Sequence, residues 1–338
     1  MIDTFICANT KNGFFSLQNE VINERAKRVY VIKGGPGTGK STLIRRVAAA
    51  VGAAELIHCS SDPDSLDGAV LSDGTVLFDG TSPHLAEPPL PGAAGRIINT
   101  GELWDESKLI PHKNEIAALS AAISEEYRAA YSLLSAAGKA DELVSSAALP
   151  LICCQRISEY SKSLVKRRLK EKEGKGNISK RFLSAHCHKG TFTLKDTILS
   201  LSNERIFLND KYLSVADAVM KEISERAVLR GHDVICFFSP LDPSRISHVV
   251  IPGASLCFTT DPSLATRKVN CARFLTEVIS FPNRLKLYGE LSKSALFAAK
   301  ARLCEAKRLH DELEKYYVAA LDKRASEQLA AKIISEIS

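Results

Sequence analysis

The sequence predicts an α/β protein built from two related halves, each a small parallel-sheet core followed by a helical segment. A β-branched run, a glycine-rich loop and a helical stretch follow one another near the N-terminus, as in an α/β unit. The pattern of this half returns in the second, and each half ends in a stretch rich in alanine, leucine and charge with helical spacing. The expected cores are 1–105 and 181–271, followed by helical segments at 106–180, which includes a basic linker, and 272–338.

The first core contains a motif that recognises phosphate. Residues 34–41, called the glycine-rich loop below, match G-x-x-x-x-G-K-[ST] and lie between the β-branched run 29–32 and the helical stretch 42–51. A strand before the motif and a helix after it are the context that a P-loop nucleoside triphosphatase requires. The residues expected to bind nucleotide are Gly34, Gly35, Pro36, Gly37, Thr38, Gly39, Lys40, Ser41 and Thr42.

Each residue type in this loop suits nucleotide chemistry. Glycines let backbone N–H groups turn towards phosphate oxygens, and the start of the following helix adds its positive end. Lys40 is expected to bind the β- and γ-phosphates, and the hydroxyl of Ser41 to coordinate Mg²⁺. The predicted ligands are therefore ATP and Mg²⁺; ATP is favoured over GTP because the chain lacks an Asn-Lys-x-Asp guanine motif.

A carboxylate for the metal is expected at the end of a neighbouring strand. Residues 75–79 form an apolar run that ends in Asp79, the position from which P-loop proteins hold Mg²⁺. The competing interpretation is a β-hairpin, because Asp73 and Gly74 form a strong turn signal before this run. Gly80 follows Asp79 where vigorous ATPases carry a glutamate, so slow hydrolysis is expected.

Three aspartates follow another predicted strand, at 54–59. Loops at the carboxyl ends of parallel strands face the ligand, so Asp62, Asp64 and Asp67 are candidates to contact Mg²⁺ or an acceptor hydroxyl. Asp62 is the predicted catalytic residue together with Lys40 and Asp79. For Asp64 and Asp67, turn and helix-cap chemistry is favoured.

Three further residues have one functional and one ordinary interpretation each. His84 either positions the γ-phosphate or is a surface histidine in a turn, which is favoured. Arg96 either contacts phosphate or forms a surface salt bridge, which is favoured. Trp104, the single tryptophan, is expected to pack in the core.

The second half repeats the first but lacks its nucleotide chemistry. Residues 5–17 return at 182–194, and the pair at 62–63 matches the Asp-Pro pair at 242–243. In this alignment Gly34 becomes Asp210, Lys40 becomes Ala216 and Ser41 becomes Asp217. Carboxylates there repel phosphate, so one competent site and one inert copy are predicted. Residues 214–217 fit a capping box for the helix that follows.

Cysteine and charge patterns predict no further site. The nine cysteines have no C-x-x-C spacing, which argues against a disulfide framework and a zinc site. Adjacent residues of a strand point to opposite faces, so the histidines of 186–188 are expected to be structural. The stretch 162–181 holds nine basic and two acidic residues and carries a net charge of +7, so the rest of the chain, with a total of +6, is close to neutral. A solvated helix end is favoured there, and nucleic-acid binding is the less favoured alternative.

The composition is that of an ordinary globular protein. The chain has 338 residues, of which 45% are hydrophobic and 25% charged, enough for two domains. Its apolar stretches fall short of the roughly 18 residues that span a bilayer, and its first residues lack the basic flank of a signal peptide. A cytoplasmic protein without a membrane partner is expected.

The chain resembles a poorly characterised bacterial family of tandem P-loop ATPases, described as related to nucleotide kinases. The resemblance covers nearly the whole chain and is carried by Val29-Tyr30-Val31-Ile32-Lys33-Gly34-Gly35-Pro36-Gly37-Thr38-Gly39-Lys40-Ser41-Thr42-Leu43, Asp62-Pro63-Asp64-Ser65-Leu66-Asp67 and Phe78-Asp79-Gly80-Thr81-Ser82-Pro83-His84. It implies ATP binding at the first loop and no established substrate. That family carries a second phosphate-binding loop, from which residues 210–217 depart.

These observations predict an ATP-binding protein with slow Mg²⁺-dependent hydrolysis, in which ATP acts as a conformational signal between an active and an inactive repeat. The alternative is a small-molecule or nucleotide kinase in which Asp62 activates an acceptor hydroxyl. A nucleotide-regulated scaffold or nucleic-acid binder is the third hypothesis. The motif is shared by all P-loop classes, so the partner, whether a small molecule or a protein, stays unidentified.

Overall fold

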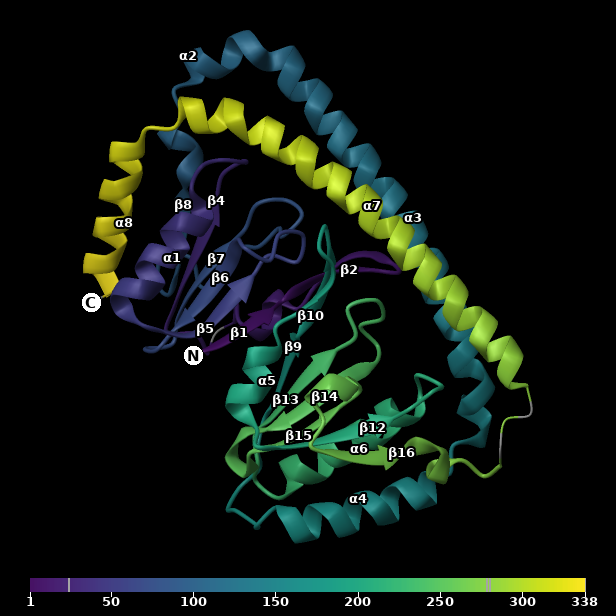
Figure 1. Ribbon diagram of the computed structural model, residues 1–338. Helices are drawn as coiled ribbons and strands as arrows, with labels where there is room; N and C mark the ends of the chain where they lie inside the picture. Colours follow the sequence, from purple (N-terminus) through teal and green to yellow (C-terminus); the bar gives the residue numbers. More distant parts are fainter. Residues whose placement is uncertain (24, 278, 280, 338) are drawn as a thin grey trace.

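One mixed sheet of twelve strands runs through both halves in the computed structural model (Figure 1). The structure describes residues 1–23, 25–277, 279 and 281–337. The strands of the first half are β1 (Ile2–Phe5), β2 (Cys7–Thr10), β3 (Gly13–Ser16), β4 (Arg28–Lys33), β5 (Ala53–His58), β6 (Leu66–Leu71), β7 (Thr75–Asp79) and β8 (Gly95–Asn99). Those of the second are β9 (Ile178–Phe182), β10 (Ser184–Cys187), β11 (Gly190–Thr193), β12 (Glu204–Asn209), β13 (Val234–Phe238), β14 (Ile246–Ile251), β15 (Leu256–Thr259) and β16 (Arg267–Asn270).

The helices connect and cover this sheet. They are α1 (Lys40–Val51), α2 (Glu106–Leu109), α3 (Lys113–Ala148), α4 (Cys154–Arg168), α5 (Lys195–Leu201), α6 (Val215–Leu229), α7 (Pro282–Ala320) and α8 (Lys323–Ile337). The predicted α/β class is confirmed.

The two halves have the same strand order. The first half of the sheet runs β1-β5-β6-β7-β4-β8, and the second runs β9-β13-β14-β15-β12-β16. Directions agree too: β1 pairs parallel with β5 as β9 does with β13, and β4 pairs parallel with β7 and β8 as β12 does with β15 and β16. The halves join where β1 and β9 pair antiparallel at Phe5 and Phe182. The two halves of the sheet therefore have the same topology.

The sheet is mixed, whereas a parallel one was expected. β6 runs antiparallel to both β5 and β7. The cause is the turn at Asp73 and Gly74, where Gly74 has a φ of 88° and joins β6 directly to β7. β14 repeats this arrangement between β13 and β15.

The long helices α3 and α7 lie side by side and antiparallel (Figure 1). His112 packs against Tyr316 near one end, with ring centroids 5.0 Å apart, and Arg302 pairs with Glu126 further along at 3.4 Å. The two predicted helical segments therefore pair with each other.

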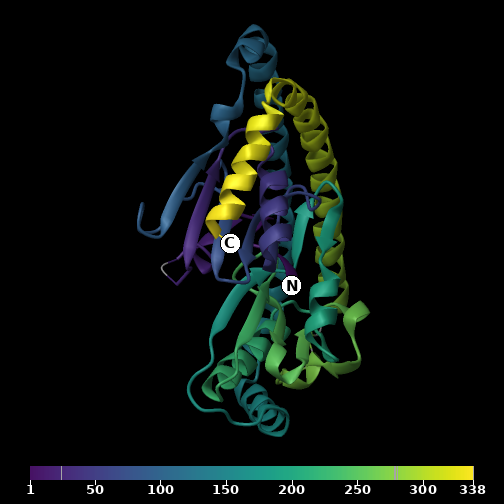
Figure 2. The same ribbon diagram turned by 90° about the vertical axis from the view of Figure 1, so that its left-hand side faces the viewer.

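The helices that follow this pair cross over between the halves. α4, at the end of the first half of the chain, packs on α6 of the second half, whereas α8 packs on α1 of the first (Figure 2). Ala330 and Ile333 of α8 belong to the same apolar cluster as Leu43 and Val47 of α1. The core of the first half is thus completed by the last residues of the chain.

Backbone hydrogen bonds fix both crossovers in the same way. Asp105 donates its N–H to Ala320 O at 2.9 Å, and Asp322 donates to Leu103 O at 2.8 Å. In the second half Thr276 and Cys153 donate equivalent bonds, each at 2.8 Å, to Leu151 O and Phe274 O. The repetition therefore extends to the helical segments. The predicted boundary at 105 falls between elements, whereas that at 180 falls inside β9 and that at 271 falls inside a short helical turn, Cys271–Phe274.

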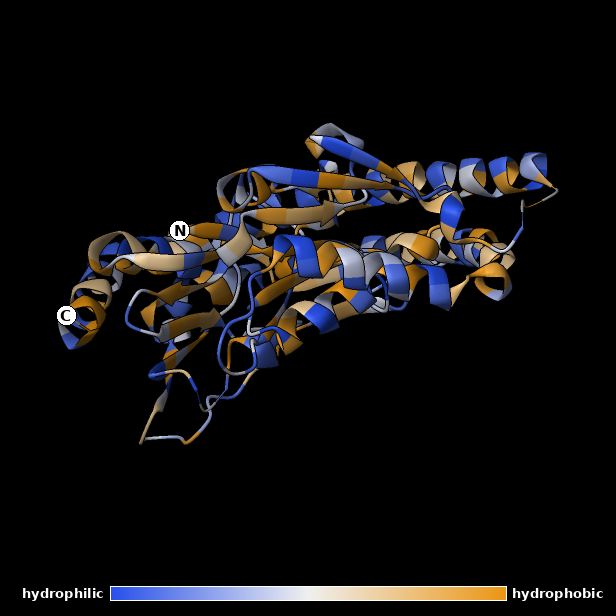
Figure 3. Ribbon diagram, turned by 90° about the horizontal axis from the view of Figure 1, so that it is seen from below, coloured by the Kyte–Doolittle hydropathy of each residue, from blue (hydrophilic) through white to orange (hydrophobic). Residues whose placement is uncertain are grey.

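Polar and apolar residues alternate along the long helices (Figure 3). Such alternation is expected of helices that bury one face only. Among the described helices, none has the length and apolar character needed to cross a membrane.

Candidate functional site

The glycine-rich loop joins the buried strand β4 to the start of α1. Gly37 and Gly39 have φ values of 67° and 77°, a region that other residues adopt at a cost. Gly34 is required for a different reason, because a Cβ there would lie 2.1 Å from Thr100 Oγ1. Strand, loop and helix thus have the order predicted from the motif, with the N-terminus of α1 at the loop.

Lys40 lies inside this loop. Its Nζ donates hydrogen bonds to Gly34 O at 2.7 Å and Gly35 O at 2.8 Å. Asp79 Oδ2 lies 3.6 Å from the same nitrogen, and both side chains are nearly buried. The ammonium and the carboxylate predicted to act together are therefore adjacent.

Asp79 lies in the predicted hairpin and also borders the strand that leads into the loop. It ends β7, which forms a hairpin with β6 on one side and pairs parallel with β4 on the other, with Asp79 opposite Ile32. Its Oδ1 accepts the N–H of Thr81 at 2.8 Å, and the Thr81 hydroxyl donates to Gly34 O at 2.8 Å. A hairpin strand next to the loop strand leaves Asp79 Oδ2 free to face Lys40.

The hydroxyls of the loop have different environments. Ser41 Oγ accepts the N–H of Leu66 at 2.9 Å, which ties α1 to the start of β6. Thr38 is buried and donates to Gly35 O at 3.0 Å, whereas Thr42 is exposed. Ser41, Asp79 and Lys40 are thus the loop-side residues that could hold Mg²⁺ and phosphate oxygens.

Asp62 lies apart from this group. Its Oδ1 accepts the N–H of Asp64 at 3.3 Å, its Oδ2 accepts the Ser65 hydroxyl at 3.1 Å, and Lys307 of α7 lies 3.5 Å away. These are turn and ion-pair contacts. Asp64 forms a similar surface pair with Lys189 at 2.6 Å.

Asp67 is the carboxylate of this loop that enters the site. It is 5% exposed, and burial raises the pKa of its carboxyl, an effect strengthened by Asp79 and opposed by His84 and Lys40. Turn chemistry was favoured for it because it follows a Pro-containing loop. The sequence feature that could have predicted its place in the site is its position at the start of an otherwise apolar strand, where burying a carboxylate is costly.

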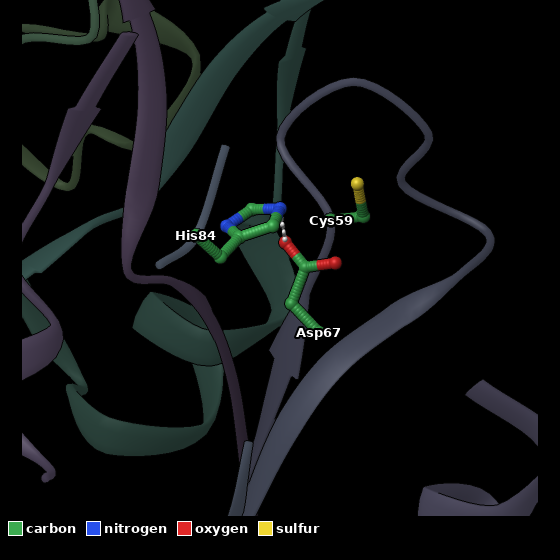
Figure 4. Close-up of side chains that lie close together, drawn as sticks. All are labelled: Cys59, Asp67 and His84. Atoms are coloured by element: carbon green, nitrogen blue, oxygen red, sulfur yellow. Dashed lines mark ion pairs between the residues drawn. The ribbon is translucent and has the colours of Figure 1, made fainter. Parts of the chain in front are cut away.

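His84 is buried, so the expected surface position is wrong. Its Nε2 lies 3.4 Å from Asp67 Oδ2, and its ring meets those of Phe14 and Phe78 edge-on. Figure 4 shows His84, Asp67 and Cys59 converging from the loop after β7, the start of β6 and the loop after β5.

Arg96 has the ordinary role that was favoured, whereas Trp104 lies outside the core clusters formed by the described residues. Arg96 pairs with Glu336 of α8 at 2.9 Å. Trp104 is partly buried and covers the loop: a Cβ at Gly35 would lie 2.8 Å from its Cη2. Its ring centroid is 4.8 Å from that of Tyr317 on α7.

The end of α7 covers the same loop. A Cβ at Gly37 would lie 3.1 Å from Tyr317 Cβ, 3.1 Å from Val318 Cγ2 and 3.2 Å from Glu314 O. Because α7 begins beside the second half and ends over this loop (Figure 1), it links the site directly to the other repeat.

The equivalent loop of the second half contains its own anion. Asp210 stands where the first half has Gly34, and its carboxylate accepts the N–H groups of Tyr212 and Ala216, each at 2.8 Å. The predicted capping box at 214–217 is wrong, because the Ser214 side chain makes no cap bond and Asp210 supplies the acceptor. Asp217 instead accepts the N–H of Ile246 at 2.9 Å, as Ser41 accepts that of Leu66.

The backbone of this second loop still resembles the first. Leu213, the counterpart of Gly37, has a φ of 63° against 67° for the glycine. A leucine in this region is strained, so the surrounding structure must enforce the conformation.

The other predicted features lie outside the site. The nine cysteines are all free, and His186 and His188 make separate contacts with Thr191 and Ser61 O. The basic stretch 162–181 comprises the end of α4, a loop and most of β9.

Comparisons with known proteins give no family for this chain: no family model, curated protein or solved structure matches it. The resemblance to tandem P-loop ATPases therefore stays a prediction, and the function is argued from the site itself.

Proposed function

We propose that the first half binds ATP with Mg²⁺ at the glycine-rich loop and hydrolyses it slowly, and that binding is signalled to the second half through α7. The two halves are then a competent and an inert copy of one P-loop unit. Their shared strand order and directions support this duplication.

The observation that carries the proposal is the contrast between the two loops. In the second half the carboxylate of Asp210 accepts the N–H of Ala216 at the helix start. The first half has the same strand, loop and helix, but Gly34 and Lys40 stand at these positions. A glycine and a lysine at a helix N-terminus favour an external anion, for which phosphate is suited.

The neighbouring residues suit Mg²⁺-dependent phosphoryl chemistry. Ser41 and Asp79 would hold Mg²⁺, and Lys40 would bind phosphate oxygens once its ammonium leaves the carbonyls of Gly34 and Gly35. In hydrolysis a water oxygen forms a bond to the γ-phosphorus, and the bond between the γ-phosphorus and the ADP oxygen breaks. The proton of the attacking water passes to the released phosphate and to solvent. Gly80 after Asp79 supplies no base for this water, which favours a slow reaction.

The kinase alternative is less favoured because Asp62, its expected base, is held in a turn and paired with Lys307. Coupling between the halves is favoured by the contacts of Tyr317 and Val318 with Gly37. Movement of the loop around phosphate would therefore displace the end of α7.

The test uses γ-labelled ATP with Mg²⁺, with and without a cell metabolite extract, and separates all labelled products. Lys40→Ala is compared with Lys27→Ala. Lys27 is an exposed lysine that pairs with Asp73 and directly precedes β4, at the end of this strand away from the glycine-rich loop. Loss of charge-assisted bonds to phosphate is worth about 1.5–3 kcal/mol, or about 10- to 100-fold in ATP affinity.

We expect labelled free phosphate from the wild type and from Lys27→Ala, and its loss in Lys40→Ala. Label on a new compound in the extract would establish the kinase alternative. The proposal would be refuted if the folded wild-type protein showed no ATP binding and no turnover.

A further inference from the structure

We propose that Cys59, Asp67 and His84 form a binding site for a divalent transition-metal ion such as Zn²⁺, beside the glycine-rich loop. The proposal goes beyond nucleotide binding and uses none of the residues assigned to it. Cys59 is partly buried, the other two are buried, and the candidate ligand atoms all lie within 4.8 Å of one another (Figure 4).

The spacing of His84 and Asp67 fits two ligands of one ion. Nε2 and Oδ2 are 3.4 Å apart, which is long for a charge-assisted hydrogen bond. Bond lengths of about 2.0–2.3 Å in a tetrahedral site put neighbouring ligand atoms roughly 3.3–3.8 Å apart. The third candidate ligand, Cys59 Sγ, lies within 4.8 Å of the ligand atoms of both other residues.

The hydrogen bonds around His84 present a lone pair to this space. Cys7 donates its S–H to Ser16 Oγ at 3.4 Å, so its sulfur is left to accept from His84 Nδ1 at 3.3 Å. With its proton on Nδ1, a neutral imidazole has its lone pair on Nε2. A hydrogen bond to the second ring nitrogen is the usual way in which a metal-binding histidine is oriented.

Asp67 adds an independent observation. Among the described residues, His84 Nε2 at 3.4 Å is the charged group paired with its buried Oδ2, and this oxygen accepts no hydrogen bond of normal geometry, although a buried carboxylate oxygen is costly unless it is hydrogen-bonded. The lone pair of His84 and this oxygen face each other, and a cation between them would satisfy both.

The second half shows that the fold does not require these side chains. Its equivalent positions carry Ser239, Ser247 and Leu264. The backbone is nevertheless the same: the N–H of Cys59 donates to Ser65 O at 3.0 Å, and that of Ser239 to Arg245 O at 2.9 Å. The ligand set therefore accompanies the loop that has Lys40, and is lost in the copy that has Asp210.

The chemistry of the three donors selects the ion. A thiolate and an imidazole favour Zn²⁺ or a similar ion over Mg²⁺, which prefers oxygen ligands. Three protein ligands leave one tetrahedral position open, as in sites where the ion also binds water or substrate.

The test titrates the full-length protein with Zn²⁺ by calorimetry and with Co²⁺ by absorbance, in excess Mg²⁺ and without nucleotide. A thiolate-to-Co²⁺ charge-transfer band reports directly on a sulfur ligand. We expect this band in the wild type, its loss in Cys59→Ser, and at least tenfold weaker Zn²⁺ binding in Asp67→Asn and His84→Gln.

Matched controls remove the same residue types elsewhere. Cys304 and His310 lie on α7, the latter in a second group with Asp311 and Glu314. Cys304→Ser and His310→Gln are expected to keep the band and the affinity, and Lys40→Ala to lose nucleotide but keep the metal, which separates this proposal from the first.

Absence of the band in the wild type would overturn the proposal, as would its persistence in Cys59→Ser. Circular dichroism and gel filtration check that each variant is folded. Should Asp67→Asn fail to fold, Cys59→Ser decides the question, because it exchanges only sulfur for oxygen.

Discussion

Contact between α7 and the glycine-rich loop can be tested by adding one methyl group to the loop. In Gly37→Ala the new Cβ would lie 3.1–3.2 Å from atoms of Tyr317, Val318 and Glu314. These distances are shorter than ordinary van der Waals contacts, so the end of α7 must retreat by a few tenths of an ångström. The added methyl group faces α7, so the substitution directly tests the packing of α7 over the glycine-rich loop.

The cost has two parts, which a control separates. Alanine at a φ of 67° costs about 1–2 kcal/mol for the left-handed conformation. Partial loss of packing at the end of α7 adds about 1 kcal/mol, since a gap of this order removes a quarter or more of each contact. Gly92→Ala has the same type of backbone cost at a φ of 81°, but no atom lies within 4 Å of its Cβ.

Two measurements then distinguish strain from displacement. Urea unfolding is expected to show a loss of about 2–3 kcal/mol for Gly37→Ala and about 1–2 kcal/mol for Gly92→Ala. Hydrogen exchange is expected to accelerate at 314–321 in Gly37→Ala alone. Equal stability losses with unchanged exchange at 314–321 would refute the idea that α7 is held on this loop.

Two further predictions concern the joint between the halves and its dependence on pH. Arg181 and Glu55 form a bidentate buried pair (Nε to Oε1, 2.6 Å; Nη2 to Oε2, 2.9 Å). Arg181→Met or Glu55→Gln alone should lower the free energy of unfolding by about 3–5 kcal/mol, and the double variant should lower it much less. Additive losses in unfolding experiments would disprove coupling between the two side chains. Burial lowers the pKa of His186 and His248 from 6.5 to about 4, so the unfolded chain binds more protons between these values and the free energy of unfolding should fall as pH drops from 6.5 to 4, by up to about 3 kcal/mol per histidine. Replacing both His186 and His248 by Gln should reduce the dependence of the free energy of unfolding on pH, whereas replacing exposed His112 should not. An unchanged dependence on pH in the double variant would exclude His186 and His248 as its cause.

Local patterns were sufficient to predict the centre of the site. A β-branched strand, a glycine-rich turn and a helix are fixed by neighbouring residues, and the predicted helix start near Lys40 agrees with α1. The similarity of the two halves was visible for the same reason, since each half keeps its own apolar spacing. The hairpin and the metal-side carboxylate were treated as alternatives for Asp79, although one strand can pair on both edges.

Long-range packing was beyond the sequence. An amphipathic helix shows that it must bury one face but not against which partner, so the crossing of α4 and α8 was not predicted. His84 was assigned to the surface because turns are usually exposed. Its burial depends on Phe14, Phe78 and Asp67, which come from three separate segments.

The asymmetry between two halves of one topology bears on how the protein would work. Asp210 belongs to the chain, so the second loop has its anion at all times, whereas an anion at the first loop must come from solution. The second half would then stay in one state while the first changes between two. Since α7 starts beside the constant half and ends over the variable loop, nucleotide binding would be registered as a movement relative to a fixed reference. Asp210→Gly is therefore expected to alter the stability of the second half without creating a second nucleotide site, because Ala216 still replaces the lysine.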